Sequence, residues 1–278
     1  MIHVVSFSGG RTSAYLVSLL EEKRKSEGWD VRYMFMDTGA EHPRTYEFIR
    51  KVVDHFGIEL HCLKTHFPDK LGKGPVPEKL SIDEIGWDLS TWRSMIYKHS
   101  TPFNPGGGFC TERLKTEIAR KYIRQNWGKE ITQWIGIRAD EPRRLKEKPG
   151  FRYLAELSDF EKQDVLDWWS EMPFDLELEE HLGNCVFCIK KNPPKVALAM
   201  RDEPELAEEW SSMFEEGGVR DLGRKFPKEQ IYRWHFTPRK LLETFAEFPR
   251  DELMGRVRRT RYLSGGCSES CEAFISDD

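Results

Sequence analysis

Residues 6–13 read SFSGGRTS, at the point where an apolar, strand-like run over residues 2–7 gives way to a helical pattern. Two consecutive glycines let the backbone turn sharply and present successive N–H groups to an anion, and the N-terminus of the following helix adds partial positive charge. Ser8, Thr12 and Ser13 can donate hydroxyl hydrogen bonds, and Arg11 can pair with a phosphate. The stretch predicts a phosphate site. A helix capped by Ser or Thr after a tight turn is the structural alternative.

The same stretch excludes two common nucleotide motifs. It is neither a Walker A loop, G-x-x-x-x-G-K-[ST], nor the G-x-G-x-x-G turn of dinucleotide-binding folds. An acidic residue after the second apolar run, Asp37, could read a ribose in a dinucleotide fold, but the missing glycine pattern argues against that fold.

Apolar runs and helical patterns alternate through the first half of the chain. Runs at residues 2–7, 31–36 and 58–63 are separated by helical patterns, the second of which Pro43 can open. This βαβαβ order predicts an α/β fold, a parallel sheet flanked by helices that binds ligands beyond the carboxyl ends of its strands. A helix over residues 111–124 and a fourth strand over residues 131–137 continue the pattern.

The remaining segments predict loops and a second, helical part. Residues 66–108 are rich in proline and glycine and predict long loops. Beyond residue 188 only helical patterns occur, for example over residues 205–214 and 238–248. We therefore expect an α/β nucleotide-binding domain over residues 1–190 and a helical C-terminal region over residues 191–278 that ends in a cysteine-containing tail.

Composition limits the partners. The chain has 278 residues, 43 Lys and Arg against 47 Asp and Glu, and a net charge of −4, so it lacks an overall basic footprint for nucleic acid. A basic run over residues 256–261 could still touch phosphates. No apolar stretch reaches the ~18 residues of a membrane helix, and no basic leader precedes the first apolar run. We expect a cytoplasmic protein with no membrane partner, and homo-oligomerisation stays open.

Six cysteines are too few for a disulfide scaffold, so their positions matter more than their number. Cys185 and Cys188 form a C-x-x-C turn that can present two thiolates to one metal or cluster. By residue type an iron–sulfur cluster, a structural zinc ion and a redox disulfide all remain open. Cys62 lies in an apolar run and is expected in the core.

Four segments in register resemble the phosphoadenylyl-sulfate (PAPS) reductase family within the PP-loop ATP pyrophosphatase, or adenine nucleotide alpha hydrolase-like, superfamily. They read SGGRTS (8–13), DTGAEHPRTY (37–46), CTERLK (110–115) and GIRADEPRR (136–144). Each segment alone is weak, but four in the family's order are specific, and the resemblance covers residues 1–190. It implies the PP-loop fold and an adenine-nucleotide site.

The resemblance assigns roles position by position. Expected nucleotide-binding residues are Ser6, Ser8, Gly9, Gly10, Arg11, Thr12, Ser13, Asp37, Thr38, Gly39, Gly136 and Arg138. Lys115, Arg143 and Arg144 are expected to bind a sulfate, phosphate or other substrate anion. Arg11, Asp37 and Arg138 are the expected catalytic residues of the core, and Cys267 and Cys271 those of the tail.

The resemblance also implies a 4Fe-4S cluster held by Cys110, Cys185 and Cys188, with zinc as the alternative metal. Cluster-containing members carry a cysteine doublet where this chain has Phe109 and Cys110, so one ligand is missing. Cys267 or Cys271 could supply the fourth ligand, or one iron could stay open. The catalytic cysteine of the family's reductases is followed by glycine, but neither tail cysteine of this chain is.

Three functions compete at this stage. The first is an ATP-splitting, Mg²⁺-assisted enzyme that adenylates a substrate and supports sulfur transfer to an acceptor that is a small molecule or a nucleic acid. The second is a sulfonucleotide reductase that releases sulfite. The third is a non-catalytic nucleotide-binding module with structural zinc. The intact Gly9–Gly10 pair favours the first, because the reductases have no β,γ-phosphates to hold.

Overall fold

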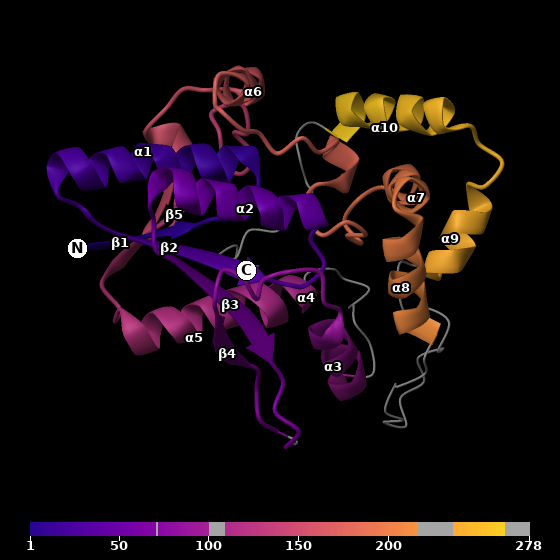
Figure 1. Ribbon diagram of the computed structural model, residues 1–278, viewed down its shortest axis with the longest axis horizontal. Helices are drawn as coiled ribbons and strands as arrows, with labels where there is room; N and C mark the ends of the chain where they lie inside the picture. The colour runs from indigo at the N-terminus through magenta and orange to yellow at the C-terminus, as the bar shows by residue number, and fades with distance from the viewer. Residues whose placement is uncertain (71, 100–108, 216–235, 265–278) are drawn as a thin grey trace.

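The computed structural model describes residues 1–70, 72–99, 109–215 and 236–264, and Figure 1 shows their arrangement. A six-stranded sheet with strand order β4-β3-β2-β1-β5-β6 forms the centre. Its strands are β1 (Ile2–Ser6), β2 (Asp30–Asp37), β3 (Leu60–His66), β4 (Val76–Leu80), β5 (Ile131–Ile135) and β6 (Phe151–Tyr153). All neighbouring strands are parallel except β3 and β4. The predicted α/β fold with a parallel sheet is confirmed.

Helices cover both faces of the sheet (Figure 1). α1 (Arg11–Glu27) and α2 (Pro43–Phe56) pack on one face, and α5 (Glu117–Asn126) packs on the other. α2 begins after His42, whose ring nitrogen accepts a hydrogen bond from the Arg44 N–H, with Pro43 at the first helical position. α1 and α2 both end at a left-handed glycine, Gly28 and Gly57, which is a common helix stop.

The core is divided by the sheet. Side chains of β1, such as Val5, join the α1 and α2 side, whereas Val4 joins the α5 side, as expected from alternation along a strand. The larger cluster continues into the C-terminal helices through Val196 and Trp210. The core of the sheet therefore extends without a break into the helical part.

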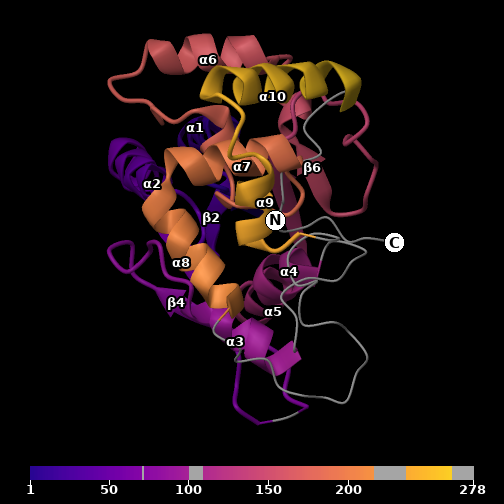
Figure 2. The same cartoon turned by 90° about the vertical axis from the view of Figure 1, so that its right-hand side faces the viewer.

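The C-terminal helices lie beyond the carboxyl edge of the sheet, opposite the start of β1 (Figures 1 and 2). They are α7 (Pro193–Asp202), α8 (Pro204–Glu215), α9 (Pro238–Thr244) and α10 (Arg250–Ser264). α6 (Lys162–Ser170) packs against α1, and the short η3 turn (Glu180–Leu182) precedes the C-x-x-C segment. The helical C-terminal part is confirmed, while the domain boundary at residue 190 stays a prediction.

The prediction of long loops over residues 66–108 is wrong in part. β4 pairs antiparallel with β3 at the sheet edge, where Pro77 is tolerated because an edge strand needs fewer donors. α3 (Ser90–His99) follows, with Trp92 and Met95 buried. β5 stops two residues before the predicted end, at Ile135, because Gly136 approaches α1 there.

The predicted helix over residues 111–124 is not a uniform α-helix. α4 (Phe109–Thr111) leads into a π-helical turn, η1 (Glu112–Thr116), before α5 begins. π-Helical turns are rare overall, but those that do occur are often found at functional sites. Among the helices that the structure describes, none is long and apolar enough to cross a membrane.

Candidate functional site

The glycine loop, residues 8–13, connects β1 to α1 at the carboxyl edge of the sheet. The Ser13 hydroxyl accepts a hydrogen bond from the Ser8 N–H at 3.1 Å, lies 2.9 Å from the Ser8 hydroxyl and donates to the Gly10 carbonyl at 3.0 Å. Gly10 stands at the N-cap of α1 with no side-chain cap, so the first N–H groups of the helix face the loop. Ser6 lies just before the loop, buried at the end of β1.

Two glycines are required by close approaches at this loop. Gly9 has φ +78°, and a Cβ there would lie 2.7 Å from Thr45 Cγ2 of α2. A Cβ on Gly136, just after β5, would lie 3.2 Å from the Ser13 backbone. Gly10 is different, because its nearest atom would be Ser8 Oγ at 3.8 Å. The open side of Gly10 therefore leaves room for a ligand to approach the backbone.

Arg11 belongs to the loop and Arg138 contacts it through Thr12, and both arginines pair with carboxylates. Arg11 donates to both oxygens of Asp175, at 2.6 and 2.8 Å, and its carbonyl accepts a hydrogen bond from the Trp169 indole. Arg138 pairs with Asp140 at 2.8 Å and donates to the Thr12 hydroxyl at 3.3 Å. The structure thus brings both predicted catalytic arginines to the loop.

The predicted anion-binding residues do not form one set. Arg143 is exposed beyond the loop, and Arg144 pairs with the buried Glu141. Lys115 lies elsewhere, buried on the π-helical turn, with its Nζ 3.6 Å from Glu41 Oε1. Lys115 therefore belongs to the cavity described below rather than to the arginine segment.

Asp37, Thr38 and Gly39 lie at the turn where β2 ends. This is the carboxyl edge of the sheet, the same edge that carries the glycine loop. Asp37 is buried and accepts hydrogen bonds from the Gly39 N–H at 2.8 Å and the Tyr46 hydroxyl at 3.0 Å. Burial raises the pKa of Asp37 to about 6, although these donors oppose the rise. Gly39 has φ +69°, and a Cβ there would lie 1.9 Å from the Asp88 carbonyl oxygen.

A cavity lies next to this turn and gathers three cysteines from two distant segments. Its cavity volume is about 20 Å³, and it is open to solvent on one side. Its lining residues are Thr38, Trp92, Cys110, Thr111, Leu114, Lys115, Cys185, Phe187, Cys188, Ile189 and Trp210. We call it the cysteine cavity. The structure therefore brings together the three thiols that the family resemblance assigned to a cluster.

Cys185 connects the cavity to the β2 turn. Its Sγ lies 3.5 Å from the Thr38 hydroxyl and 3.5 Å from Glu41 Oε1. A backbone hydrogen bond from the Val186 N–H to the Ala40 carbonyl, 2.9 Å long, fixes the two segments against each other. The turn after β2 and the thiol site are thus in direct contact through Thr38.

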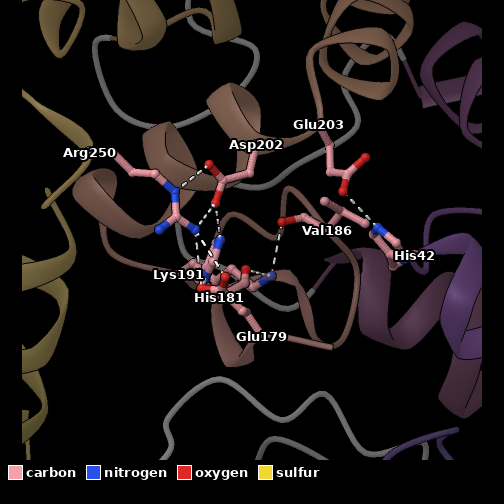
Figure 3. A network of polar contacts seen from close by, with 8 residues as sticks. All are labelled: His42, Glu179, His181, Val186, Lys191, Asp202, Glu203 and Arg250. Atoms are coloured by element: carbon pink, nitrogen blue, oxygen red, sulfur yellow. Dashed lines mark hydrogen bonds and ion pairs between the residues drawn. The ribbon is translucent and has the colours of Figure 1, made fainter. Parts of the chain in front are cut away.

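A network of polar contacts, drawn in Figure 3, anchors the C-x-x-C loop. The Lys191 ammonium, almost fully buried, donates to the carbonyls of His181 at 2.8 Å and Val186 at 2.9 Å. His181 contacts Asp202 at 2.8 Å, and Arg250 of α10 pairs with Asp202 at 2.8 Å. The C-terminal helices therefore anchor the loop that carries Cys185 and Cys188.

The spacing of the three thiols can be compared with the sulfur spacing around a single zinc ion. A tetrahedral zinc ion with Zn–S bonds of about 2.3 Å holds its sulfurs about 3.8 Å apart. Within the described ranges, the one trio of His, Cys, Asp and Glu ligand atoms lying within 4.8 Å of one another is Glu179, His181 and Asp202. Arg250 already neutralises that trio. Cys110, Cys185 and Cys188 form no such trio, so their sulfurs do not all lie within 4.8 Å of one another.

The remaining cysteines are accounted for as follows. Cys62 is fully buried in β3, as expected of a core residue, and burial raises its thiol pKa to about 12. The four cysteines in the described part of the chain form no disulfide with one another. Cys267 and Cys271 lie outside the described residues, so their predicted roles as fourth ligand or catalytic thiol stay predictions.

Comparison with known proteins identifies the family. The phosphoadenosine phosphosulfate reductase domain family matches residues 2–172. The chain belongs to this family. Members of it are generally enzymes. The match ends before Cys185 and Cys188, so it does not show the iron–sulfur branch.

Two relatives are similar over most of this chain, but both are uncharacterised and neither indicates an activity. The chain is 48% identical over 279 residues to "Uncharacterized nin region protein ORF290" of Escherichia phage lambda, covering 99% of this chain and 96% of that protein. It is 24% identical over 246 residues to "Uncharacterized protein MJ0066" of Methanocaldococcus jannaschii. The second similarity covers 83% of this chain but 45% of that protein.

Four residues of this PAPS reductase-family chain were not found from sequence. Asp175 pairs with Arg11 across a separation of 164 residues, and Glu41 lies within a recognised motif whose pattern leaves that position unspecified. Trp92 and Trp210 line the cavity from α3 and α8. The helical pattern over residues 205–214 indicated a buried face but not what that face meets.

Proposed function

We propose that this chain is an ATP-splitting enzyme that adenylates an acceptor and supports sulfur transfer with an iron–sulfur cluster. One observation carries the proposal. Thr38 belongs to the turn expected to bind the nucleotide, lines the cysteine cavity, and has its hydroxyl 3.5 Å from Cys185 Sγ. An acceptor adenylated at the turn would thus be formed next to the thiol site.

The glycine loop supplies the nucleotide half. The backbone N–H groups from Gly9 onwards and the N-terminus of α1 bind the phosphates of ATP, which Mg²⁺ accompanies as counterion. An acceptor oxygen attacks the α-phosphorus, pyrophosphate leaves, and a sulfur nucleophile then displaces AMP from the acceptor. Arg11 and Arg138 stabilise the negative charge that builds on the leaving pyrophosphate.

The cysteine cavity supplies the sulfur half. Cys110, Cys185 and Cys188 would hold the cluster, and their gathering at one cavity from two distant segments supports a group shared by all three. When bound, the cluster supplies iron at which sulfur can be held for transfer. The chain's own contribution is partial burial: Cys185 and Cys188 are each 8% exposed, and the aromatic side chains of Trp92, Phe187 and Trp210 line the cavity with them.

Sulfonucleotide reduction is the second candidate, and the description of the matched family favours it. In that reaction a cysteine thiolate attacks the sulfur of adenylyl sulfate or of its 3′-phosphorylated form, and the adenine nucleotide leaves. A second thiol, from the chain or from an added thiol reductant, then attacks the S-sulfocysteine, so that sulfite leaves and a disulfide forms. The reaction needs a nucleophilic thiol, for which Cys267 and Cys271 are the candidates. The paired glycines of the loop favour ATP, whose leaving pyrophosphate needs many donors.

Reaction products separate these two functions. The reduced, anaerobically purified protein is incubated with ATP plus candidate acceptors and, separately, with both sulfonucleotides. We expect AMP and pyrophosphate from ATP, in an acceptor-dependent manner, and no sulfite. Sulfite release that disappears in Cys267→Ser or Cys271→Ser would replace the adenylation proposal with the reductase.

The cluster has its own test. Visible absorbance with iron and sulfide analysis should show a cluster in the wild-type protein and its loss in Cys188→Ser. Cys62→Ala is the matched control, because Cys62 is buried in β3 away from the cavity lining. Stoichiometric zinc without iron in the wild-type protein would refute the cluster.

A further inference from the structure

Trp210 of α8 has a buried indole N–H with no acceptor. The side chain is 1% exposed, and its Nε1 makes no hydrogen bond within the part of the chain that the structure describes. Leaving such a donor unsatisfied carries a desolvation penalty. A buried donor of this kind calls for a partner that arrives with a ligand.

The other indoles at this edge of the sheet are satisfied. Trp92 lines the same cavity with its ring centroid 5.1 Å from that of Trp210, and its Nε1 donates to the Thr38 carbonyl at 2.8 Å. Trp169 donates to the Arg11 carbonyl, and Trp87 donates to Glu209. Trp210 lines the cavity and differs from these three tryptophans because its indole N–H has no partner among the described residues.

The empty space beside Trp210 is the cysteine cavity. Phe187, between the two cysteines of the C-x-x-C loop, has its ring centroid 5.9 Å from that of Trp210. A group held by the three thiols would therefore lie against the indole. Its sulfur atoms would be the acceptors at hand, and hydrogen bonds to the sulfurs of a cluster help to set its reduction potential.

We propose that the Trp210 indole N–H donates a hydrogen bond to a sulfur of the iron–sulfur group held by Cys110, Cys185 and Cys188. The inference rests on the proposed function, because it needs that group to be present. It makes α8 of the C-terminal helical part, which lies beyond the 2–172 family match, a wall of the site. Trp210 acts here as a positioning residue that tunes the bound group.

The test compares Trp210→Phe with Trp92→Phe in the full-length, chemically reconstituted protein. Both variants keep an aromatic ring, but only the first removes an N–H without another partner. We expect Trp210→Phe to keep wild-type iron and sulfide content and to shift the midpoint potential to a more negative value. The N–H stabilises the added negative charge of the reduced state. Trp92→Phe should lower stability while leaving the potential unchanged.

A second measurement does not depend on the variant folding. In wild-type protein labelled with ¹⁵N-tryptophan, electron–nuclear double resonance of the reduced cluster should show coupling to one indole nitrogen. A loaded protein with no such coupling, or a potential unaltered in Trp210→Phe, would overturn this inference alone. A wild-type protein that binds no iron and sulfide would overturn the cluster proposal together with it.

Discussion

The Ser8, Ser13 and Arg11 side chains of the glycine loop have partners within the protein, whereas Trp210 at the cysteine cavity has a buried N–H with no partner among the described residues. In the loop, Ser8 pairs with Ser13 and Arg11 pairs with Asp175. Trp210 lines the cavity and Glu41 contacts the lining residue Cys185; within the described ranges, Trp210 Nε1 and Glu41 Oε2 are buried without a hydrogen-bond partner. The two regions nevertheless meet at Thr38.

The difference indicates how each region responds to a ligand. Loop side chains that are already paired are stable without a ligand, and a phosphate that recruits the Arg11 side chain must compete with Asp175. A cavity with unpaired buried atoms carries a cost until a ligand or water fills it. Nucleotide affinity should therefore depend on competition inside the loop, whereas occupancy of the cavity should stabilise the fold.

The largest expected effect separates the two adjacent glycines. Gly9→Ala combines a left-handed φ with a Cβ 2.7 Å from Thr45 and should lower the free energy of unfolding by about 3 kcal/mol. Gly10→Ala should change it by less than about 1 kcal/mol, yet weaken ATP binding because the new Cβ occupies the open side. Urea denaturation and calorimetric titration measure both. Unchanged ATP affinity in Gly10→Ala would place the nucleotide elsewhere.

The next effect belongs to the cavity. Lys191→Met removes an ammonium that donates to the carbonyls of His181 and Val186, so two buried acceptors lose a donor. We expect the free energy of unfolding to fall by about 2 kcal/mol and iron content after reconstitution to fall with it. Lys190→Met is the control, because that neighbouring side chain is only half-buried. Wild-type stability and iron content would mean that the C-x-x-C loop does not depend on this anchor.

Sequence patterns predicted the loop better than the cavity, for a physical reason. The glycine loop is a local device: a strand end, two glycines and a helix start lie within residues 6–13. The cavity is closed by Trp92 and Trp210, which are far apart in the chain and meet only through packing. Family motifs located the three thiols, but no local pattern indicates which aromatic ring will face them.

The missed elements follow the same logic. α3 lies in a segment whose prolines and glycines indicated loops, and its buried Trp92 and Met95 stabilise it through tertiary contacts rather than local propensity. Asp175 follows no motif, and only folding brings it to Arg11. Lys115 was assigned to the arginine set from its motif, but the π-helical turn directs it to Glu41.

Acidity should stabilise the β2 turn. Burial raises the pKa of Asp37 from 3.8 to about 6, so the folded chain binds this proton more tightly than the unfolded chain. The contribution of Asp37 to the free energy of unfolding therefore grows as pH falls, by about 1 kcal/mol between pH 7 and pH 5. Urea denaturation of the wild-type protein and of Asp37→Asn at both pH values isolates the contribution of Asp37 to the free energy of unfolding. An identical pH dependence in the two proteins would show that Asp37 titrates normally.

The smallest effect tests competition inside the loop. Asp175 holds both donors of Arg11, and the Arg11 guanidinium keeps the pKa of that carboxyl below its usual range although burial opposes it. Asp175→Asn weakens this competitor, so Arg11 should turn to phosphate more readily. The ATP dissociation constant should then fall about threefold, in line with the ~1 kcal/mol or less of a partly exposed ion pair.

Asp167→Asn makes the same charge change at an exposed position of α6 that does not contact Arg11. The gain should shrink at high salt and leave iron content unaltered, because the cavity has no part in this exchange. Weaker ATP binding in Asp175→Asn, with Asp167→Asn unchanged, would instead make Asp175 a support that positions Arg11 for the nucleotide.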